Sequence, residues 1–291
     1  MVEDHNKISH TAAMCARARA KYTDMPYAQK IAAQIKDADG KIPWPVRMLT
    51  SLMPGRLAQV TLLEGRYVAT NEALERSNYQ ILEVAAGLSP RGLTHSDRGT
   101  FYVETDLPEM IRAKEEIVKT IRQEEGRGIS PNHLFRELNV LDEDSLSRIG
   151  DLFASQGNGR PIAVIHEGLL MYLSREEQNR MRDNLAQFFR IYSPKGVWIS
   201  PDLSYKPAGN EGLIVKWAKR RIEKRTGRKF TSFPSPEEAA RFLEEGGFQG
   251  DVLSNEHLVK DLTSVRGGRV SIKKAREVAS RYRVCVARLS A

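Results

Sequence analysis

Three carboxylates stand where apolar runs that fit buried strands come to an end. Glu83 closes YQILE, Asp106 closes FYVETD, and Glu167 follows PIAVIH. A carboxylate can accept hydrogen bonds from both hydroxyls of a ribose, and it can also pair with an ammonium group. Parallel strands bring their carboxyl ends to one edge of a sheet, where ligands bind. The three acids therefore predict a cofactor site at that edge.

The turn after the first of these runs, AAGLSPRG, indicates which cofactor fits. A dinucleotide site needs G-x-G-x-x-G so that the backbone can approach a pyrophosphate, but here the next glycine after Gly87 is Gly92. The stretch instead matches the acidic-x-small-x-Gly-x-small turn of S-adenosylmethionine methyltransferases, on Glu83, Ala85, Gly87 and Ser89. Small residues let the methionine part of that cofactor lie against the backbone. Glu83 would bind its ammonium group directly or through water.

A second acid and an amide extend the expected site along the sheet. Asp106 lies 19 residues beyond Gly87, close to the separation of about 20 at which an acid grips a ribose diol. The alternative is that Glu104 or Asp106 caps the next helix, whose first turn holds Pro108; we assign the ribose to Asp106. Asn139, at the end of the third strand, is placed to bind the exocyclic amine of an adenine.

The end of the fourth strand, IHEGLLMYL, supplies candidate groups for the reaction itself. Glu167 stands at the mouth of the site, where an unpaired acid needs a cation or a donor. His166 is a candidate general base, with a strand-buried histidine satisfied by the backbone as the alternative. Tyr172 is a candidate to polarise or orient the acceptor, with a core tyrosine as the alternative. We find no Ser-His-Asp or Cys-His spacing that indicates a nucleophilic mechanism.

These side chains need a parallel sheet to position them, and the strand and helix patterns predict one. The strand candidates are YQILEVAA, TFYVETD, HLFRELNV, PIAVIHEG, GVWISPDL and, at the end, YRVCVARL. Helical patterns separate the first five strands: PEMIRAKEEIVKTIRQEEG, EDSLSRIGDLFASQ and SREEQNRMRDNLAQFFRIY. This alternation implies right-handed crossovers. We expect an α/β fold with a doubly wound, mostly parallel sheet.

The remaining segments read as additions to that sheet. HTAAMCARARAKY, PYAQKIAAQI and LLEGRYVATNEALERSN are helical in pattern, and residues 42–57 read as a loop and a short helix. We expect a helical N-terminal cover over residues 1–55 and the cofactor-binding domain over 56–291, with an insertion over 205–230. SPEEAARFLEEGGF predicts a further helix, capped by Ser235.

The composition is that of a soluble globular protein, with 41% hydrophobic and 28% charged residues. No apolar run is long enough to span a membrane, and the polar start MVEDHNKISH does not resemble a secretory signal. Cys15 and Cys285 lie at opposite ends without metal-ligand spacing. We therefore expect a cytoplasmic protein with neither a disulfide framework nor a metal site.

The net charge of +8 is concentrated in two stretches. Residues 216–229 and residues 266–288 each carry eight basic residues and one acid, so the rest of the chain is net negative. Such stretches attract anions, and the alternative is a solvated helix face. The first stretch lies in the expected insertion. Arg220 and Arg221 are therefore candidates to hold an anionic, small-molecule acceptor.

These motifs resemble the leucine carboxyl methyltransferase family, including its bacterial branch linked to polyketide O-methylation. The family typically shows a GAGLDxR turn, here AAGLSPR, and a VDLP strand end followed by a lysine, here TDLP with Lys114. Its EGxLMYL strand end is here EGLLMYL. Its N-terminal Thr-Ala, followed eight residues later by Arg-Ala, is here at 11–12 and 19–20. The match spans about residues 9–203 and recurs at the final strand.

The resemblance implies a class I methyltransferase fold with S-adenosylmethionine as donor. Together with the basic insertion, it leads to the hypothesis that the protein methylates an oxygen of a carboxylate or hydroxyl on a small anionic metabolite. Carried over residue by residue, it places Arg19 and Arg66 at the cofactor's carboxylate, Gly87 under its methionine, Asp106 at the ribose, Asn139 and Val140 at the adenine edge, and Glu167 at the ammonium. The sequence departs from the family pattern at Ala85, Ser89 and Asn139, where a glycine and two aspartates are usual.

Three other functions fit parts of the pattern. Methylation of a protein C-terminal carboxylate, the reaction that names the family, needs an open cleft for a peptide tail. A non-catalytic protein would keep the fold to sense the cofactor or a partner. RNA methylation would use the two basic stretches, but we find no N-P-P-Y-like tetrapeptide after the fourth strand and no appended RNA-binding module. We expect neither a nucleic-acid nor a membrane partner.

The hypothesis of a basic insertion over the acceptor makes a testable prediction. Replacing both Arg220 and Arg221 by glutamine should raise the Michaelis constant for the acceptor about tenfold, because two charge-assisted contacts are lost. The affinity for S-adenosylmethionine should not change. Steady-state kinetics and calorimetry measure the two quantities. Loss of cofactor affinity with an unchanged Michaelis constant would contradict the assignment.

Overall fold

The computed structural model describes residues 6–35, 56–203, 223, 228–233, 235–280 and 282–290. Three helices precede the sheet: α1 (Asn6–Tyr22), α2 (Ala28–Gln34) and α4 (Arg56–Glu75). They overlap the three helices predicted in this region, although α4 begins at Arg56 and the predicted helix begins at residue 62. The loop predicted from residue 42 lies outside the described residues, as does most of the predicted insertion over 205–230, with Arg220 and Arg221 in it.

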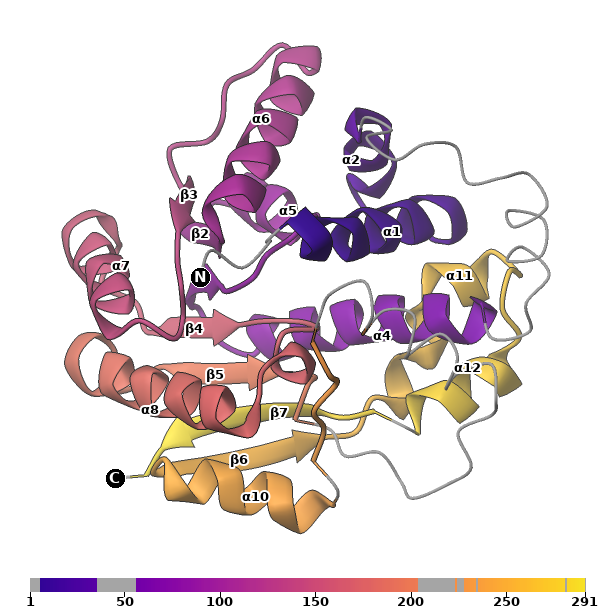
Figure 1. Cartoon of the computed structure of the whole chain (residues 1–291). Helices are drawn as coiled ribbons and strands as arrows, with labels where there is room; N and C mark the ends of the chain where they lie inside the picture. The colour runs from indigo at the N-terminus through magenta and orange to yellow at the C-terminus, as the bar shows by residue number, and fades with distance from the viewer. Residues whose placement is uncertain are drawn as a thin grey trace.

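A seven-stranded sheet forms the centre of the molecule, in the order β3-β2-β1-β4-β5-β7-β6 (Figure 1). The five predicted strands before the insertion are present and run parallel. They are β1 (Gln80–Glu83), β2 (Tyr102–Asp106), β3 (His133–Glu137), β4 (Ile162–Ile165) and β5 (Val197–Ser200). The predicted last strand, β7 (Val284–Leu289), is antiparallel to β5. The doubly wound, mostly parallel sheet is confirmed.

One strand was missed by the sequence reading. β6 (Phe248–Leu253) pairs with β7 at the edge of the sheet. Most of its side chains are exposed, so FQGDVL lacks the alternation of a half-buried strand. Gly250 leaves room for the side chains of Leu243 and Cys285, which come within 3 Å of where a Cβ would lie. Gly250 weakens the strand pattern in the sequence, but the packing of Leu243 and Cys285 against the strand requires a glycine at this position.

The helices between the strands follow the predicted order. They are α6 (Pro108–Glu124), α7 (Glu143–Gln156), α8 (Arg175–Tyr192) and α10 (Pro236–Glu245). The predicted cap on α10 forms, since the Ser235 hydroxyl accepts a hydrogen bond from the Glu238 N–H. A capping box of Ser174 and Glu177 on α8 was not predicted. The short helices α5 (Arg91–Asp97), α11 (Thr263–Arg266) and α12 (Ile272–Ala279) were not predicted, nor were the 3₁₀ helices η1 (Leu170–Tyr172) and η2 (Glu256–Asp261).

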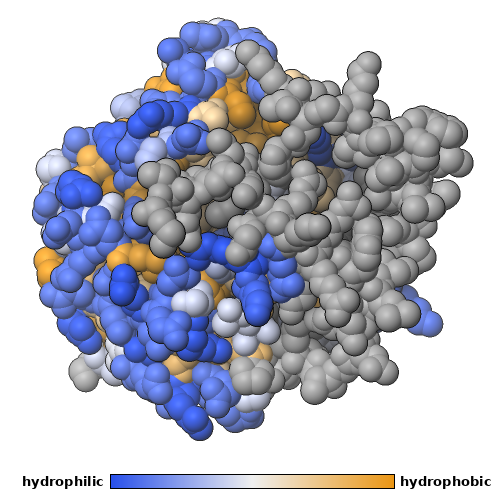
Figure 2. All heavy atoms as spheres, viewed as in Figure 1, coloured by the Kyte–Doolittle hydropathy of each residue, from blue (hydrophilic) through white to orange (hydrophobic). Residues whose placement is uncertain are grey.

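Both faces of the sheet are covered, as a parallel sheet requires. Leu82, Val164 and Trp198 point into a core shared with α7, α8 and α10. Ile81, Ala163 and other residues from the same strands point the opposite way, toward α4. Figure 2 shows that the outer surface over α7, α8 and α10 is largely hydrophilic. No described helix has the length and apolar character needed to cross a membrane.

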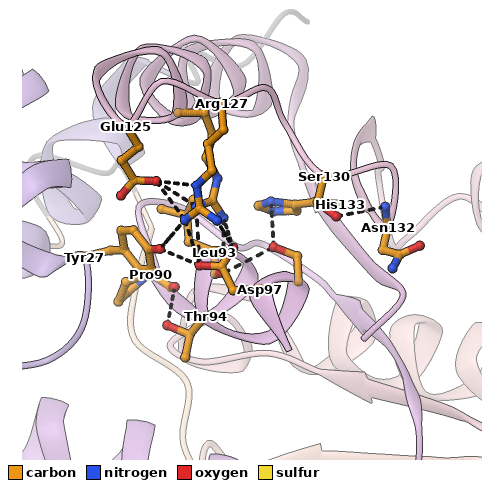
Figure 3. Close-up of polar contacts among 12 residues, drawn as sticks. Tyr27, Pro90, Leu93, Thr94, Asp97, Glu125, Arg127, Ser130, Asn132 and His133 are labelled. Atoms are coloured by element: carbon orange, nitrogen blue, oxygen red, sulfur yellow. Dashed lines mark hydrogen bonds and ion pairs between the residues drawn. The ribbon is translucent and has the colours of Figure 1, made fainter. Parts of the chain in front are cut away.

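The N-terminal helices are attached to the sheet domain by an apolar core and a polar network. Apolar residues of α1 and α2 pack against α5 and α6. The Tyr27 hydroxyl, at the start of α2, donates to Asp97 on α5 and accepts hydrogen bonds from Arg122 and Arg127 (Figure 3). Glu125 accepts from Lys30 on α2 at 2.5 Å and from the same two arginines at 3.0 and 2.8 Å. This network joins the C-terminal end of α6 to α2.

The network gives the fold a pH-dependent contribution through Glu125. Burial acts to raise the pKa of this carboxyl, but hydrogen bonds from Lys30, Arg127 and Arg122 lower it to about 2. A carboxyl with a depressed folded-state pKa stabilises the fold above its unfolded pKa of about 4.3. That contribution is lost as the pH falls through about 2.

We expect Glu125→Gln to lower the free energy of unfolding at pH 7 by about 1 kcal/mol, since the pairs are partly exposed. The difference from wild type should shrink as the pH falls from about 4.3 toward the folded-state pKa. Urea unfolding across this range measures it. Glu124→Gln is the control. The Glu124 carboxylate accepts a hydrogen bond from the Gln34 amide, which is uncharged, so this substitution breaks no ion pair of the network. A pH-independent difference would argue against the network.

Candidate functional site

The candidate site lies at the carboxyl ends of β1 and β4, the adjacent central strands. The chain winds outward from β1 through β2 to β3 and then crosses to β4 on the other side of β1. Such a switch point is where ligands bind in doubly wound sheets. Residues 84–90, here called the β1 turn, leave β1 at this point. The turn is fixed by hydrogen bonds from the Val84 N–H to the Ile165 carbonyl (2.8 Å) and from the Ala86 N–H to the Thr105 carbonyl (2.9 Å).

The β1 turn uses a left-handed backbone at two positions. Gly87 has φ of +49°, and Ala85 has φ of +52°. A left-handed alanine costs about 1–2 kcal/mol relative to its usual conformation, so the departure from the family's glycine at Ala85 carries a real backbone cost. A Cβ added to Gly87 would lie 3.4 Å from the Cβ of Ala12. Helix α1 therefore lies directly over the turn.

Asp106, at the end of β2, is bound to the same turn. Its two oxygens accept hydrogen bonds from the Gly87 N–H and the Leu107 N–H, each at 2.8 Å. Burial raises the pKa of this carboxyl despite those two donors. Each carboxylate oxygen can accept a second hydrogen bond, so the side chain that fixes the turn keeps acceptor capacity toward a ligand.

A fully buried guanidinium, Arg91, links the ends of β1 and β4. It donates to Glu83 at 2.6 Å and to Glu167, while its Nε donates to Asn71 on α4 at 2.8 Å. Its planar face stacks 4.5 Å from the centre of the Tyr67 ring. Arg19 on α1 then donates to the other oxygen of Glu167 at 3.3 Å. The result is a chain of alternating charges that connects α1, β4, α5 and β1.

The two acids of this chain differ in their electrostatics. Burial raises the pKa of Glu83 in spite of the Arg91 guanidinium. The pKa of Glu167 lies below its usual value, because Arg91, Arg19 and Arg66 together outweigh the effect of burial. Both oxygens of each acid have a partner, Arg91 and the Tyr102 hydroxyl on Glu83 and Arg91 and Arg19 on Glu167. Glu167 nevertheless keeps 11% of its side-chain surface exposed, against 3% for Glu83. The available negative charge is thus on Glu167.

A second charged pair lies next to this chain. Arg66 on α4 pairs with Asp202, which follows β5. Asp202 also accepts from the backbone N–H groups of Gly168 and Leu169, at 2.9 and 2.7 Å, and from that of Leu170. His166 has no exposed surface, and its Nδ1 lies 3.1 Å from Asp202. Arg66, His166 and the Gly168 N–H hold the pKa of Asp202 far below its usual range against the effect of burial.

Two of the guanidinium donors in this cluster are buried without a partner among the described residues. They are the buried Nε atoms of Arg19 and Arg66. An unsatisfied buried donor costs about 1–3 kcal/mol unless a ligand or a water accepts from it. A carboxylate is the group that guanidinium donors bind best, and Glu167 beside them can take an ammonium group. The cluster therefore fits a zwitterionic amino-acid group, which is the methionine end of the predicted cofactor.

Tyr172 lies beside this cluster, whereas Asn139 and Val140 follow β3, two strands away from β1. The Tyr172 ring in η1 meets Phe230 edge-on at 5.2 Å, and burial raises the pKa of its phenol. Asn139 is exposed, and its side-chain oxygen accepts from the Leu141 N–H at 3.1 Å. The buried Val140 offers its carbonyl to the Asn184 amide at 3.0 Å.

Most of the residues singled out from the sequence come together at the switch point. They are Arg19, Arg66, Glu83, Ala85, Gly87, Asp106, His166, Glu167 and Tyr172. Sequence reasoning missed Arg91, Asp202 and Asn71 as members of the site. Asp202 follows a predicted strand, the signal that identified the other acids. Arg91 stands in the quoted turn motif, but nothing in the sequence shows that it bridges two strands.

No group of metal-ligating side chains capable of holding an ion occurs within the described ranges.

Comparisons with known proteins place this chain in a family. The family model described as leucine carboxyl methyltransferase matches residues 7–186, more than half of the chain. No curated protein sequence matches the chain.

Two solved structures share the fold, and a third is less similar. A putative methyltransferase from Thermobifida fusca YX has a TM-score of 0.57 at 16% identity, over 96% of this chain and 94% of that one. A DUF574 family protein from Streptomyces avermitilis MA-4680 has a TM-score of 0.53 at 14% identity, over 94% and 100% of the two chains. An O-methyltransferase family protein from Burkholderia thailandensis has a TM-score of 0.49 at 13% identity; the match covers 86% of this chain and 61% of that longer one.

The Arg91 bridge makes a prediction about stability. Arg91→Met should lower the free energy of unfolding by about 3–5 kcal/mol, because Glu83 and Glu167 lose the cation that they share in a buried site. Arg98→Met is the matched control, since its ion pair with Glu75 is exposed and is worth less than about 1 kcal/mol. Urea unfolding followed by circular dichroism compares the two. Equal losses of unfolding free energy in the two variants would show that the Arg91 bridge stabilises the fold no more than an exposed ion pair does.

Proposed function

We propose that this chain, which belongs to the leucine carboxyl methyltransferase family, transfers a methyl group from S-adenosylmethionine to a carboxylate or hydroxyl oxygen of a small anionic metabolite. The observation that carries the proposal is the cluster at the switch point. It sets two unpartnered guanidinium donors beside an ionised, partly exposed carboxylate. When bound, the cofactor supplies a methyl group on a sulfonium, a good leaving group.

The proposed cofactor contacts follow from the available donors and acceptors. Arg19 and Arg66 would bind the methionyl carboxylate through their Nε groups, and Glu167 would bind the ammonium. Asp106 would accept from the ribose hydroxyls with its remaining lone pairs. Asn139 and Val140 would face the adenine, and the β1 turn with Ala85 and Gly87 would lie under the methionine.

The sequence predicts that Glu83 binds the ammonium of the cofactor, but this proposal gives Glu83 a different role. Arg91 and the Tyr102 hydroxyl already occupy its oxygens, at 2.6 and 2.7 Å. Only 3% of the Glu83 side chain is exposed, so Glu83 has almost no surface through which to contact the ammonium. We therefore assign Glu83 to holding Arg91, which in turn orients Glu167.

Helix α1 would close the site in the same scheme. Ala12 lies over Gly87, and Arg19 reaches Glu167 at 3.3 Å. These contacts support the proposal that residues 1–55 form a cover over the cofactor and residues 56–291 form the domain that binds it. The predicted insertion would then border the acceptor.

The acceptor side of the proposal relies on orientation. Burial raises the pKa of Tyr172, so its phenol keeps its proton at neutral pH and can donate a hydrogen bond to an acceptor oxygen. His166 has no exposed surface through which to reach an acceptor as a base. A carboxylate acceptor, with a pKa near 4, is already ionised and needs no base. Aligning it with the methyl group can supply about 7–11 kcal/mol of the barrier reduction.

Cofactor binding tests the proposal directly. Wild-type protein should bind S-adenosylhomocysteine in calorimetry, and Asp106→Asn should weaken binding about tenfold or more, because the side chain loses its charge and acceptor capacity. Asp151→Asn is the control, since the Asp151 side chain lies on α7 and accepts from the exposed Tyr192 hydroxyl. Absence of wild-type binding at millimolar ligand would refute the proposal.

The nature of the reaction needs a second measurement. Small carboxylic acids and phenols incubated with S-adenosylmethionine should gain the mass of one methyl group, and alkaline hydrolysis should remove it from a methyl ester but not from an ether. A methylated peptide C-terminus would instead support the protein carboxyl methyltransferase alternative. Cofactor binding without any methylated product would support the non-catalytic alternative.

A further inference from the structure

Lys114 on α6 is completely buried beside the β1 turn. A lysine is almost never fully buried unless it is paired. Its Nζ donates to the Ser89 carbonyl at 2.5 Å and to the Gly87 carbonyl at 3.4 Å. It also pairs with Glu104 on β2 at 2.6 Å. The ammonium thus makes two hydrogen bonds to the turn and one ion pair with a buried carboxylate.

Glu104 is buried as deeply as Lys114 and has a second partner. Its other oxygen lies 2.7 Å from the Nε2 of His133 on β3, whose Nδ1 is 3.4 Å from the Ser96 hydroxyl on α5. Burial acts to raise the pKa of Glu104, but Lys114 and His133 outweigh it and hold the pKa below its usual value. The neutralising partner of Lys114 therefore remains charged.

The close packing around these groups leaves them no freedom to move apart. A Cβ added at Gly92 would lie 2.0 Å from a carboxylate oxygen of Glu104 and 2.5 Å from the Nε2 of His133. α5 thus presses its backbone against the Glu104–His133 pair. The pair fixes the position of Glu104, and Glu104 fixes the ammonium of Lys114 under the β1 turn.

We propose that Lys114 is a positioning residue that sets the peptide planes of the β1 turn for cofactor binding. The inference rests on the proposed function, because it concerns the surface on which the methionine would lie. Since peptide groups are planar and trans, holding the Gly87 carbonyl toward Lys114 points the Leu88 N–H to the opposite side. Asp106 holds the Gly87 N–H by its own hydrogen bond at 2.8 Å. Lys114 and Asp106 together fix the peptide groups on both sides of Gly87.

A purely structural role for Lys114 would be to neutralise Glu104. The two roles predict different behaviour for two variants. Lys114→Met removes the three donors at similar length and leaves Glu104 without its cation. Lys114→Met combined with Glu104→Gln removes the donors and the buried charge together, and so relieves the cost of an unpaired carboxylate.

The experiment measures S-adenosylhomocysteine affinity by calorimetry, unfolding by urea, and hydrogen exchange of the turn amides in the ligand-free protein. Lys114→Met should lose stability and weaken binding about ten- to a hundredfold. The double variant should recover stability but keep the weak binding and the faster exchange of residues 86–89. Lys119→Met, on the same helix with an exposed side chain, should match wild type.

Each outcome decides the matter. Weak binding and fast exchange in a stable double variant support positioning, even if Lys114→Met alone does not fold. Wild-type affinity and exchange in the double variant would overturn it, leaving Lys114 as a partner of Glu104 while the proposed function stands. Failure of the wild type to bind S-adenosylhomocysteine would instead remove the proposed function, and this inference with it.

Discussion

The buried guanidinium of Arg91 is the contact on which the ligand-binding edge of this molecule depends. It joins Glu83 at the end of β1 to Glu167 after β4, the two strands that meet at the switch point, and it binds Asn71 on α4. Removing an ion from water costs several kcal/mol, and the cost is offset only where geometry and further hydrogen bonds are favourable. Arg91 meets that condition with four contacts, counting its stacking on Tyr67. The strand ends are therefore held in one relative position.

The charges around Arg91 are balanced, and this balance suits a zwitterionic ligand group. Three carboxylates, of Glu83, Glu167 and Asp202, face three guanidiniums, of Arg19, Arg66 and Arg91. A site with no net charge can accept a ligand end that carries one positive and one negative group without leaving either unpaired. The left-handed Ala85 in the β1 turn adds local strain at the same place, as is common where a backbone is shaped for a ligand. The methyltransferase family match and the geometry of the site thus agree.

Much of the fold could be predicted because its signals are local. Strands β1 to β5 and β7 and helices α6, α7, α8 and α10 follow from apolar periodicity and, for α10, from the cap at Ser235. β6 could not be predicted, because an exposed edge strand with a glycine has no alternation to detect. The acids at strand ends were found because a parallel sheet brings such ends to one edge. His166 was identified by its neighbours in sequence, but its complete burial became apparent only in the packed fold.

The amino-acid sequence by itself determined the α/β class, the family and the side of the sheet on which a ligand would bind. These depend on residue type and spacing, which are properties of the chain alone. The tertiary structure decided which charged groups pair and which stay available. In the fold, Glu83 pairs with Arg91 and accepts a hydrogen bond from Tyr102, while Glu167 stays partly exposed. Arg19 and Asp202, which are distant in the chain, lie in one cluster. Pairing depends on distance and burial, and both are set only when the helices close over the sheet.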